Sequence, residues 1–211
     1  IAITSMRIIR SLRKPLEKFT GAVVALGNFD GVHRGHRAVI SVTLDIAKKN
    51  GIPAGVLTFE PHPRSFFYPN DPPFRLTPLR TKESHIRESG IDILYLARFD
   101  KTFAAQSAEE FVREVLVKGL RAHHIVIGWD FVFGKDRSGN TEHLRRLSAE
   151  FGFGLTVVDP VAGAEESEPY ASRRVRSALK RGEPEVAASA LGHWWEIAGR
   201  VKEGAARGKE L

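Results

Sequence analysis

The residues of this sequence best suited to chemistry lie between positions 27 and 36. The stretch follows an apolar run and reads Gly27-Asn28-Phe29-Asp30-Gly31-Val32-His33-Arg34-Gly35-His36. Its glycines let the backbone turn tightly and approach a ligand closely. His33 and His36 are three apart and so share one side of the first turn of the helix that follows. A helix N-terminus offers free N–H groups and a positive dipole end, so the stretch predicts a phosphate cradle with two imidazole donors.

Other interpretations of these histidines are open. The dinucleotide pattern GxGxxG and the Walker A lysine are both missing here, which argues against a dehydrogenase or a P-loop kinase. Two histidines in a turn between strand and helix can simply cap and pack. A zinc site is a further alternative, because His33, His36 and His62 with Glu60 or Asp30 are suitable ligand types, although no HExxH pattern supports it.

The elements that must position these residues alternate along the chain. Short apolar runs at 22–26, 54–59, 93–97, 125–128 and 155–158 predict strands that are buried on both faces. Amphipathic stretches near 35–49, 78–89, 107–119 and 140–151 predict helices between them. This alternation predicts an α/β fold with a doubly wound parallel sheet, whose ligand lies beyond the carboxyl ends of the strands.

Two helix starts carry recognisable capping chemistry. Ser107 and Glu110 have the spacing of a capping box. Thr77 followed by Pro78 predicts an N-cap with proline at the first helical position.

The composition sets wider limits. The 211 residues carry 32 Lys and Arg against 25 Asp and Glu, a net charge of +7, and no cysteine. The charge favours anionic ligands without choosing among them, and the absence of cysteine excludes disulfides and thiolate chemistry. No run is apolar enough to span a bilayer, so we expect a cytoplasmic protein without a membrane partner. A basic cluster at 173–181 is open to two further interpretations, a solvated helix face or a surface that binds RNA or a partner.

His33-Arg34-Gly35-His36 resembles the HxGH signature of the nucleotidylyltransferase superfamily. With its flanking residues, the stretch looks like the adenylyltransferase module of bacterial FAD synthetases, the bifunctional riboflavin kinase/FMN adenylyltransferases. Further similar segments are 57–63 (LTFEPHP), 99–111, and 128–135 (GWDFVFGK) with Gly139-Asn140. Ser172 and Arg176 match the spacing of the superfamily's Ser-Ser-Thr-x-x-Arg motif, from which Ala171 and Arg173 depart.

This resemblance implies roles for particular residues. His33, His36 and Arg176 would be catalytic. Glu60, His62 and Pro63 would meet the flavin nucleotide. ATP would be bound by Gly27, Asn28, Phe29, Asp30, Gly35, Gly128, Asp130, Phe131 and Ser172.

The resemblance also implies the reaction, the transfer of AMP from ATP to FMN with release of FAD and pyrophosphate. Mg²⁺ would be carried mainly by the phosphates, so no protein metal ligand is expected. The partners would be small nucleotides, without nucleic acid. The alternatives are a nucleotidylyltransferase with another acceptor, such as phosphopantetheine or nicotinamide mononucleotide, and a non-catalytic basic module.

The predicted organisation is an adenylyltransferase domain of Rossmann-like, nucleotidylyltransferase type over residues 1–190. Residues 191–211 are expected to hold a linker and the first strand of a riboflavin kinase β-barrel. Trp194, Trp195 and Ile197 have the character of that strand, and Gly199-Arg200-Val201 resembles its family sequence. A covalently linked kinase module is therefore expected in the parent protein, and no riboflavin kinase activity is expected from this chain alone.

Overall fold

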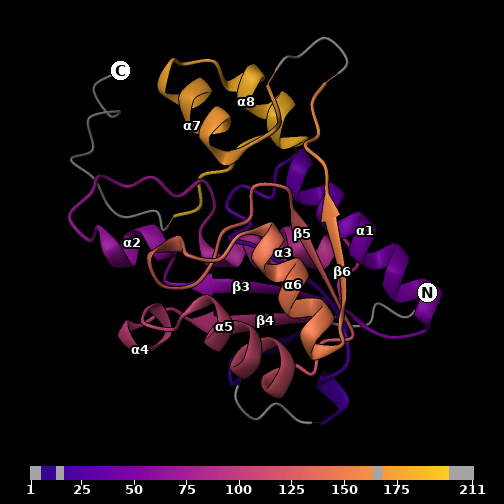
Figure 1. The fold of residues 1–211 in the computed structure, drawn as a ribbon. Helices are drawn as coiled ribbons and strands as arrows, with labels where there is room; N and C mark the ends of the chain where they lie inside the picture. The colour runs from indigo at the N-terminus through magenta and orange to yellow at the C-terminus, as the bar shows by residue number, and fades with distance from the viewer. Residues whose placement is uncertain (1–5, 13–16, 164–167, 200–211) are drawn as a thin grey trace, which may run out of the picture.

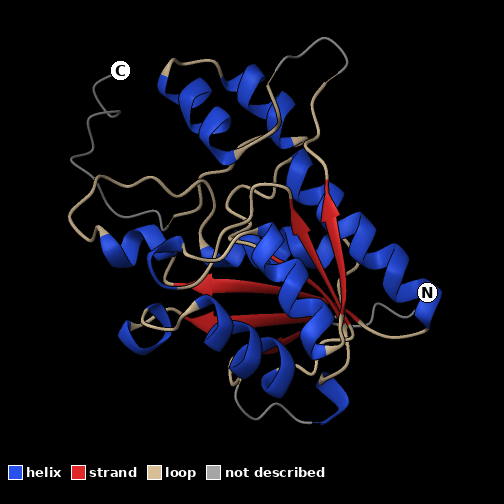
Figure 2. Cartoon of the chain, in the orientation of Figure 1, coloured by secondary structure: helices blue, strands red, loops and turns tan. Residues whose placement is uncertain are grey.

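The computed structural model describes residues 6–12, 17–163 and 168–199, and a parallel β-sheet forms its centre (Figure 2). Six strands pair in the order β1-β4-β3-β2-β5-β6, and every pairing is parallel. The strands are β1 (Arg7–Ile9), β2 (Val23–Leu26), β3 (Ala54–Glu60), β4 (Ile93–Arg98), β5 (His124–Gly128) and β6 (Gly154–Val158). The chain builds outward from β2 through β3 to β4 and then returns to β5. The topological switch point therefore lies between β2 and β5.

Helices follow the strands and pack on both faces of the sheet. They are α1 (Arg34–Asn50), α2 (Pro63–Phe67), α3 (Leu79–Glu88), α4 (Lys101–Ala104), α5 (Ala108–Glu110), the π-helix η2 (Phe111–Gly119), α6 (Thr141–Phe151), α7 (Ser172–Lys180) and α8 (Pro184–Leu191), with 3-10 turns η1 (Glu17–Phe19) and η3 (Lys135–Arg137). The predicted doubly wound α/β fold, its five strands and its four helices are confirmed. The additional strand β1 is a short edge strand that pairs with β4.

Alternate residues of each central strand enter different cores. Val24 and Leu26 join a cluster with Val112 and Leu116 of η2 and with α6. Val23 and Ala25 join a second cluster with α1 and α3. Because successive strand side chains point to opposite faces, continuous apolar runs such as residues 22–26 are the pattern that a sheet covered on both sides requires.

The last two helices form a separate layer at the end toward which β5 and β6 point (Figure 1). A third apolar cluster joins α7 to α8 through Val175, Ala178, Ala187 and Leu191, and it includes Leu76 from the segment before α3. This layer lies beyond the carboxyl ends of β5 and β6, on the side of the sheet where a ligand of such a fold binds.

One of the two capping predictions is confirmed and the other is wrong. Ser107 and Glu110 form the reciprocal capping box. Pro78, not Thr77, is the N-cap of α3. The Thr77 hydroxyl instead accepts a hydrogen bond from the backbone N–H of Gly31 at 3.0 Å. The Thr77 hydroxyl, which the sequence pattern assigned to capping the helix, is therefore used in a tertiary contact with Gly31.

The segment after α8 also differs from its prediction. Residues 194–199 form no strand. The Trp195 indole N–H donates to the carbonyl of Leu76 at 2.9 Å, and a His193 ring nitrogen lies 3.1 Å from the carbonyl of Gly31. These contacts lay the segment along the domain, so the predicted strand at Trp194, Trp195 and Ile197 is wrong. Positions 200–211, with Arg200 and Val201, lie outside the described residues. Within the described part of the chain, no helix is long and apolar enough to cross a membrane.

Candidate active site

The turn between β2 and α1 is built from unusual backbone conformations. Phe29, Gly31 and Val32 have φ angles of 48°, 86° and 40°. Left-handed φ is costly for a β-branched residue, and such strain persists where the surrounding structure enforces it, often at functional sites. Gly31 is required here twice over, because a Cβ would also lie 2.9 Å from a side-chain carbon of Leu76.

His33 ends this turn as the N-cap of α1. Its Nδ1 accepts a hydrogen bond from the backbone N–H of His36 at 3.3 Å. A neutral imidazole with an accepting Nδ1 carries its proton on Nε2, which makes Nε2–H the group available as a donor. Burial lowers the pKa of His33 to about 4, with Asp30 opposing and Arg176 reinforcing that shift. His33 is therefore neutral at pH 7.

The two imidazoles lie against each other. Their ring centroids are 3.6 Å apart, and the ring planes are nearly parallel. The centroid of the Phe29 ring lies 5.1 Å from that of His36. Burial first, and then the charges of His33, Lys82 and Arg176, lower the pKa of His36 well below its usual value. Two positively charged imidazolium rings stacked at this distance would repel each other. Both rings are therefore neutral hydrogen-bonding groups. The capping interpretation is confirmed for His33, and the phosphate cradle stays a prediction.

Asp30 is the centre of a network that joins distant segments. Its side chain is 1% exposed, and Oδ1 accepts from the backbone N–H groups of Leu76 and Thr77 at 2.9 and 3.1 Å. Oδ2 pairs with Arg176 Nη2 at 2.5 Å. With both oxygens engaged, Asp30 positions Arg176 and the residue 76–77 segment rather than offering itself to a nucleotide.

Arg176 is held at three points on its planar group. Besides the pair with Asp30, Nε donates to the carbonyl of Phe74 at 2.8 Å, and the guanidinium lies over the Phe74 ring at 5.3 Å. Its side chain is 23% exposed. A guanidinium fixed in this way and still open to solvent is prepared for bidentate contact with a phosphate.

The start of α7 is fastened to the same turn. The Ser172 hydroxyl donates to the carbonyl of Asp30 at 2.8 Å, so its single proton is already used. Gly35 permits the close approach, because a Cβ there would lie 2.8 Å from the carbonyl oxygen of Tyr170. The helix that carries Arg176 is thereby set against the N-terminus of α1.

These residues line one large cleft of about 1400 Å³ at the switch point, which we call the main cleft. It brings together fourteen of the fifteen predicted site residues: Gly27, Asn28, Phe29, Asp30, His33, Gly35, His36, His62, Pro63, Gly128, Asp130, Phe131, Ser172 and Arg176. Glu60 does not line it. Both Glu60 oxygens are taken by Arg75 in a bidentate pair at 2.8 and 2.9 Å.

His62 caps the short helix α2 on the floor of the cleft. Its Nδ1 accepts from the backbone N–H of Arg64 at 3.1 Å, and its ring meets Phe74 edge-on at 5.0 Å. Burial lowers the pKa of His62 to about 4. Among the described residues, His33, His36 and His62 form no three-ligand metal group with Glu60 or Asp30, and both of these carboxylates are bound to arginines.

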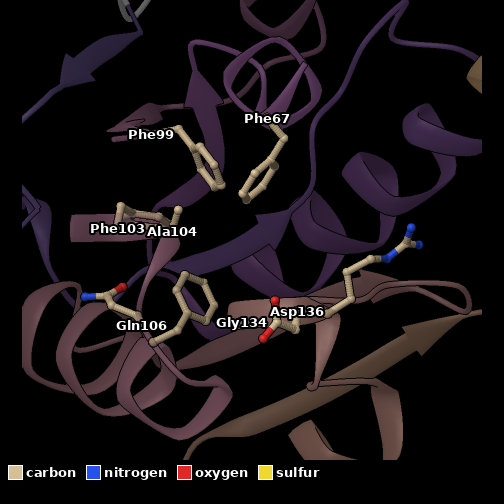
Figure 3. Close-up of a pocket in the computed structure, with 9 residues that line it drawn as sticks. Phe67, Phe99, Phe103, Ala104, Gln106, Gly134 and Asp136 are labelled. Carbon is tan, nitrogen blue, oxygen red and sulfur yellow. The ribbon is translucent and has the colours of Figure 1, made fainter. Parts of the chain in front are cut away.

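An aromatic pocket that sequence analysis did not place in the site adjoins the main cleft, and Figure 3 shows residues that line it. It has a volume of about 130 Å³, and Phe67, Phe99, Phe103 and Phe111 line both it and the main cleft. The rings of Phe67 and Phe99 stand edge to face at 5.8 Å. Four phenylalanines from α2, the β4 exit, α4 and η2 converge here. No local spacing could have revealed a set so dispersed.

Lys82 is the other residue that sequence reasoning missed. It is 1% exposed, and its ammonium donates to the carbonyl of Asn28 at 2.8 Å. Burial lowers the pKa of Lys82 to about 8, and the nearby Arg75 adds to that shift. A lysine in an amphipathic helix pattern is normally solvated, so only the folded structure reveals this cation beneath the 27–36 turn.

The fold is that of a Rossmann-like α/β protein, and its main cleft lies at the switch point of the sheet, beside the N-terminus of α1. A model of the FAD synthetase family matches residues 16–173. The chain belongs to the FAD synthetase family, and the predicted class, a nucleotidyltransferase of FAD biosynthesis, is confirmed.

Curated relatives agree with this assignment. The bifunctional riboflavin kinase/FMN adenylyltransferase of Escherichia coli K12 is 38% identical over 210 residues, which cover 98% of this chain and 66% of the relative. The enzyme of the same name from Haemophilus influenzae is 35% identical over 206 residues, with the same coverage. The chain thus spans about two thirds of the length of these relatives.

A solved structure has the same fold. It is described as a macrolide-efflux protein from Streptococcus pneumoniae, with a TM-score of 0.82 and 29% identity over 97% of this chain and 66% of that one.

Proposed function

We propose that this chain transfers AMP from ATP to FMN, forming FAD and pyrophosphate. The observation that carries the proposal is the union of two sites. The main cleft holds the α1 N-terminus, His33, His36 and Arg176, and it opens into a pocket of phenylalanines that shares its wall. An acceptor that combines a flat ring system with a phosphate fits such a pair of sites, and FMN is that kind of molecule.

In the reaction, an oxygen of the FMN phosphate attacks the α-phosphorus of ATP. A new P–O bond forms, the bond from the α-phosphorus to the bridging oxygen breaks, and pyrophosphate leaves with that oxygen. The attacking phosphate is already an anion, so no strong base is needed. Catalysis then consists of in-line positioning and of stabilising charge on the equatorial and leaving oxygens.

The side chains divide this work by their geometry. His33 carries its proton on Nε2 because Nδ1 is committed to the cap, so Nε2–H would be its donor to a phosphate oxygen. His36 stacks beside it as a second neutral donor. Arg176, fixed by Asp30, would hold the leaving pyrophosphate with the rest of its fork. His62, rigid at the start of α2, would contact the FMN phosphate.

Mg²⁺ fits the cleft as a partner of the phosphates. The carboxylates of Asp130 and Asp159 line it, and hard cations of this size take oxygen ligands, few of them from protein. When bound, Mg²⁺ would neutralise charge on the phosphate oxygens. The predicted cytoplasmic location stays a prediction.

The other acceptors that the sequence left open are separated by one experiment. The purified chain is incubated with ATP and Mg²⁺ and with FMN, nicotinamide mononucleotide or phosphopantetheine in turn, and pyrophosphate release is measured. Of the three acceptors, we expect only FMN to give pyrophosphate release. Release with another acceptor and not with FMN would contradict the proposal.

The names of the relatives also include a riboflavin kinase. We assign adenylyl transfer to the residues described here and the kinase to the third of those relatives that this chain does not match. Conversion of riboflavin to FMN by this chain would contradict that division. For the basic cluster at 173–181, Arg176 is bound to Asp30 inside the cleft, which argues against a surface made for nucleic acid.

A further inference from the structure

A second group of ligand-type side chains lies outside the main cleft. His85 comes from α3, while His193 and Glu196 come from the segment after α8. One ligand atom from each lies within 4.8 Å of the others. None of the three lines the main cleft or the aromatic pocket, so the proposed reaction does not account for them.

His85 is the least explained member of the group. Its side chain is 8% exposed, and both ring nitrogens are buried without a hydrogen-bond partner. The nearest acidic atoms are Glu88 Oε2, 3.6 Å from Nδ1, and Glu196 Oε1, 3.9 Å from Nε2. Buried polar atoms almost always have partners, so an imidazole without one at either nitrogen calls for a ligand.

The ring of His193 lies between two backbone carbonyl oxygens. Its Nε2 lies 3.1 Å from the carbonyl oxygen of Gly31 and its Nδ1 lies 2.8 Å from that of Trp194. A neutral imidazole has one N–H and can satisfy only one of these carbonyls. Histidines that bind metals characteristically donate the other ring N–H to a carbonyl or carboxylate, which fixes the tautomer. If Nε2–H donates to the Gly31 carbonyl, Nδ1 holds the lone pair, and it would bind a metal by exchanging its 2.8 Å contact with the Trp194 carbonyl for the ion.

We propose that His85, His193 and Glu196 form a binding site for a divalent transition metal of the Zn²⁺ type. Two imidazoles and one carboxylate are a set that suits Zn²⁺ and its neighbours rather than Mg²⁺. Bonds of about 2.0 Å in a tetrahedral site put ligand atoms roughly 3.3 Å apart. The 3.9 Å between His85 Nε2 and Glu196 Oε1 closes by a small rotation of Glu196, whose side chain is 59% exposed. Water completes the coordination.

A metal at this position would join three parts of the domain. It would tie the segment after α8 to α3, and through the His193 contact with Gly31 it would reach the 27–36 turn. The site therefore serves as a clamp that holds the exit segment against the nucleotide-binding turn.

The test is a calorimetric titration of the metal-free chain with ZnCl₂. The variants His193→Gln and Glu196→Gln alter exposed or partly exposed side chains, so they leave the core intact, and circular dichroism verifies the fold. His143→Gln, which changes a partly exposed histidine of α6, is the matched control. We expect the wild type and the control to bind Zn²⁺ with the same affinity. In His193→Gln and Glu196→Gln the affinity should fall at least about tenfold, since even outer partners of a metal site contribute ten- to a hundredfold.

Heat denaturation gives a second readout that is independent of activity. Zn²⁺ should raise the melting temperature of the wild type and of His143→Gln, and this rise should be smaller in Glu196→Gln at the same Zn²⁺ concentration. The proposal is overturned if the wild type binds no Zn²⁺, or if His193→Gln and Glu196→Gln bind it as tightly as the wild type does.

Discussion

Replacing Arg176 by lysine separates the two contributions that the structure assigns to this guanidinium. A lysine keeps the positive charge and can still pair with Asp30. It loses the Nε hydrogen bond to the carbonyl of Phe74 and the stacking over the Phe74 ring. One charged hydrogen bond contributes about 1.5–3 kcal/mol, and partial exposure places this one at the lower limit. We expect the free energy of unfolding to fall by about 1.5 kcal/mol.

The effect of Arg176→Lys on turnover should be larger. A single ammonium held by Asp30 has no second arm for the pyrophosphate, whereas the arginine fork serves both partners. Loss of one transition-state contact reduces kcat about a hundredfold, which is about 2.7 kcal/mol. Urea unfolding and FAD formation measure the two quantities separately. Arg181→Lys, whose side chain pairs with Glu183 at the surface beyond the end of α7, is the control and should change neither. If kcat of Arg176→Lys is within threefold of the wild-type value, the guanidinium has a structural role only, and the catalytic assignment is contradicted.

Three further perturbations follow from the site. The pKa of His33 is about 4 in the folded protein, below the ordinary 6.5. Its contribution to the free energy of unfolding is therefore fully present above pH 6.5 and is lost as the pH falls toward 4. Urea unfolding should show a loss of about 3 kcal/mol from this histidine across that range. Gly35→Ala places a Cβ against the Tyr170 carbonyl and should raise the KM for ATP by displacing the start of α7, as steady-state kinetics would show. Lys82→Met removes the ammonium that donates to the Asn28 carbonyl and should lower kcat about tenfold.

Each of these has a clear contrary result. An equal pH slope in His33→Gln would show that this imidazole does not cause the acid sensitivity. An unchanged KM in Gly35→Ala would mean that α7 yields without cost, and wild-type kcat in Lys82→Met would remove the buried cation from the electrostatics of the cleft.

The sequence was sufficient for the sheet because its signal is local. Strands buried on both faces appear as apolar runs, and all five predicted runs became strands within two residues of their predicted limits. The edge strand Arg7–Ile9 was missed because three partly exposed residues form no such run. The predicted strand at Trp194 was wrong because aromatic, apolar composition does not specify a partner, and Trp195 found one in the carbonyl of Leu76.

The site divides in the same way. The histidine pair and the helix N-terminus were predictable, since three-residue spacing and glycines are local features. The pair of Asp30 and Arg176 joins residues 146 positions apart, so sequence could name both residues but not their mutual engagement. Glu60 was predicted to meet the flavin, yet the structure gives both of its oxygens to Arg75. The aromatic pocket depends on four separate elements, so no single stretch of sequence could predict it.

The central claim is that the turn leaving β2 holds the phosphate chain of ATP with a helix end and two neutral imidazoles. The most direct measurement is chromatographic detection of FAD made from ATP, Mg²⁺ and FMN by the wild type and by His36→Ala. We predict FAD from the wild type and about a hundredfold lower kcat in the variant, the effect of losing one transition-state donor. No FAD from the wild type, or an undiminished kcat in His36→Ala, would contradict the account.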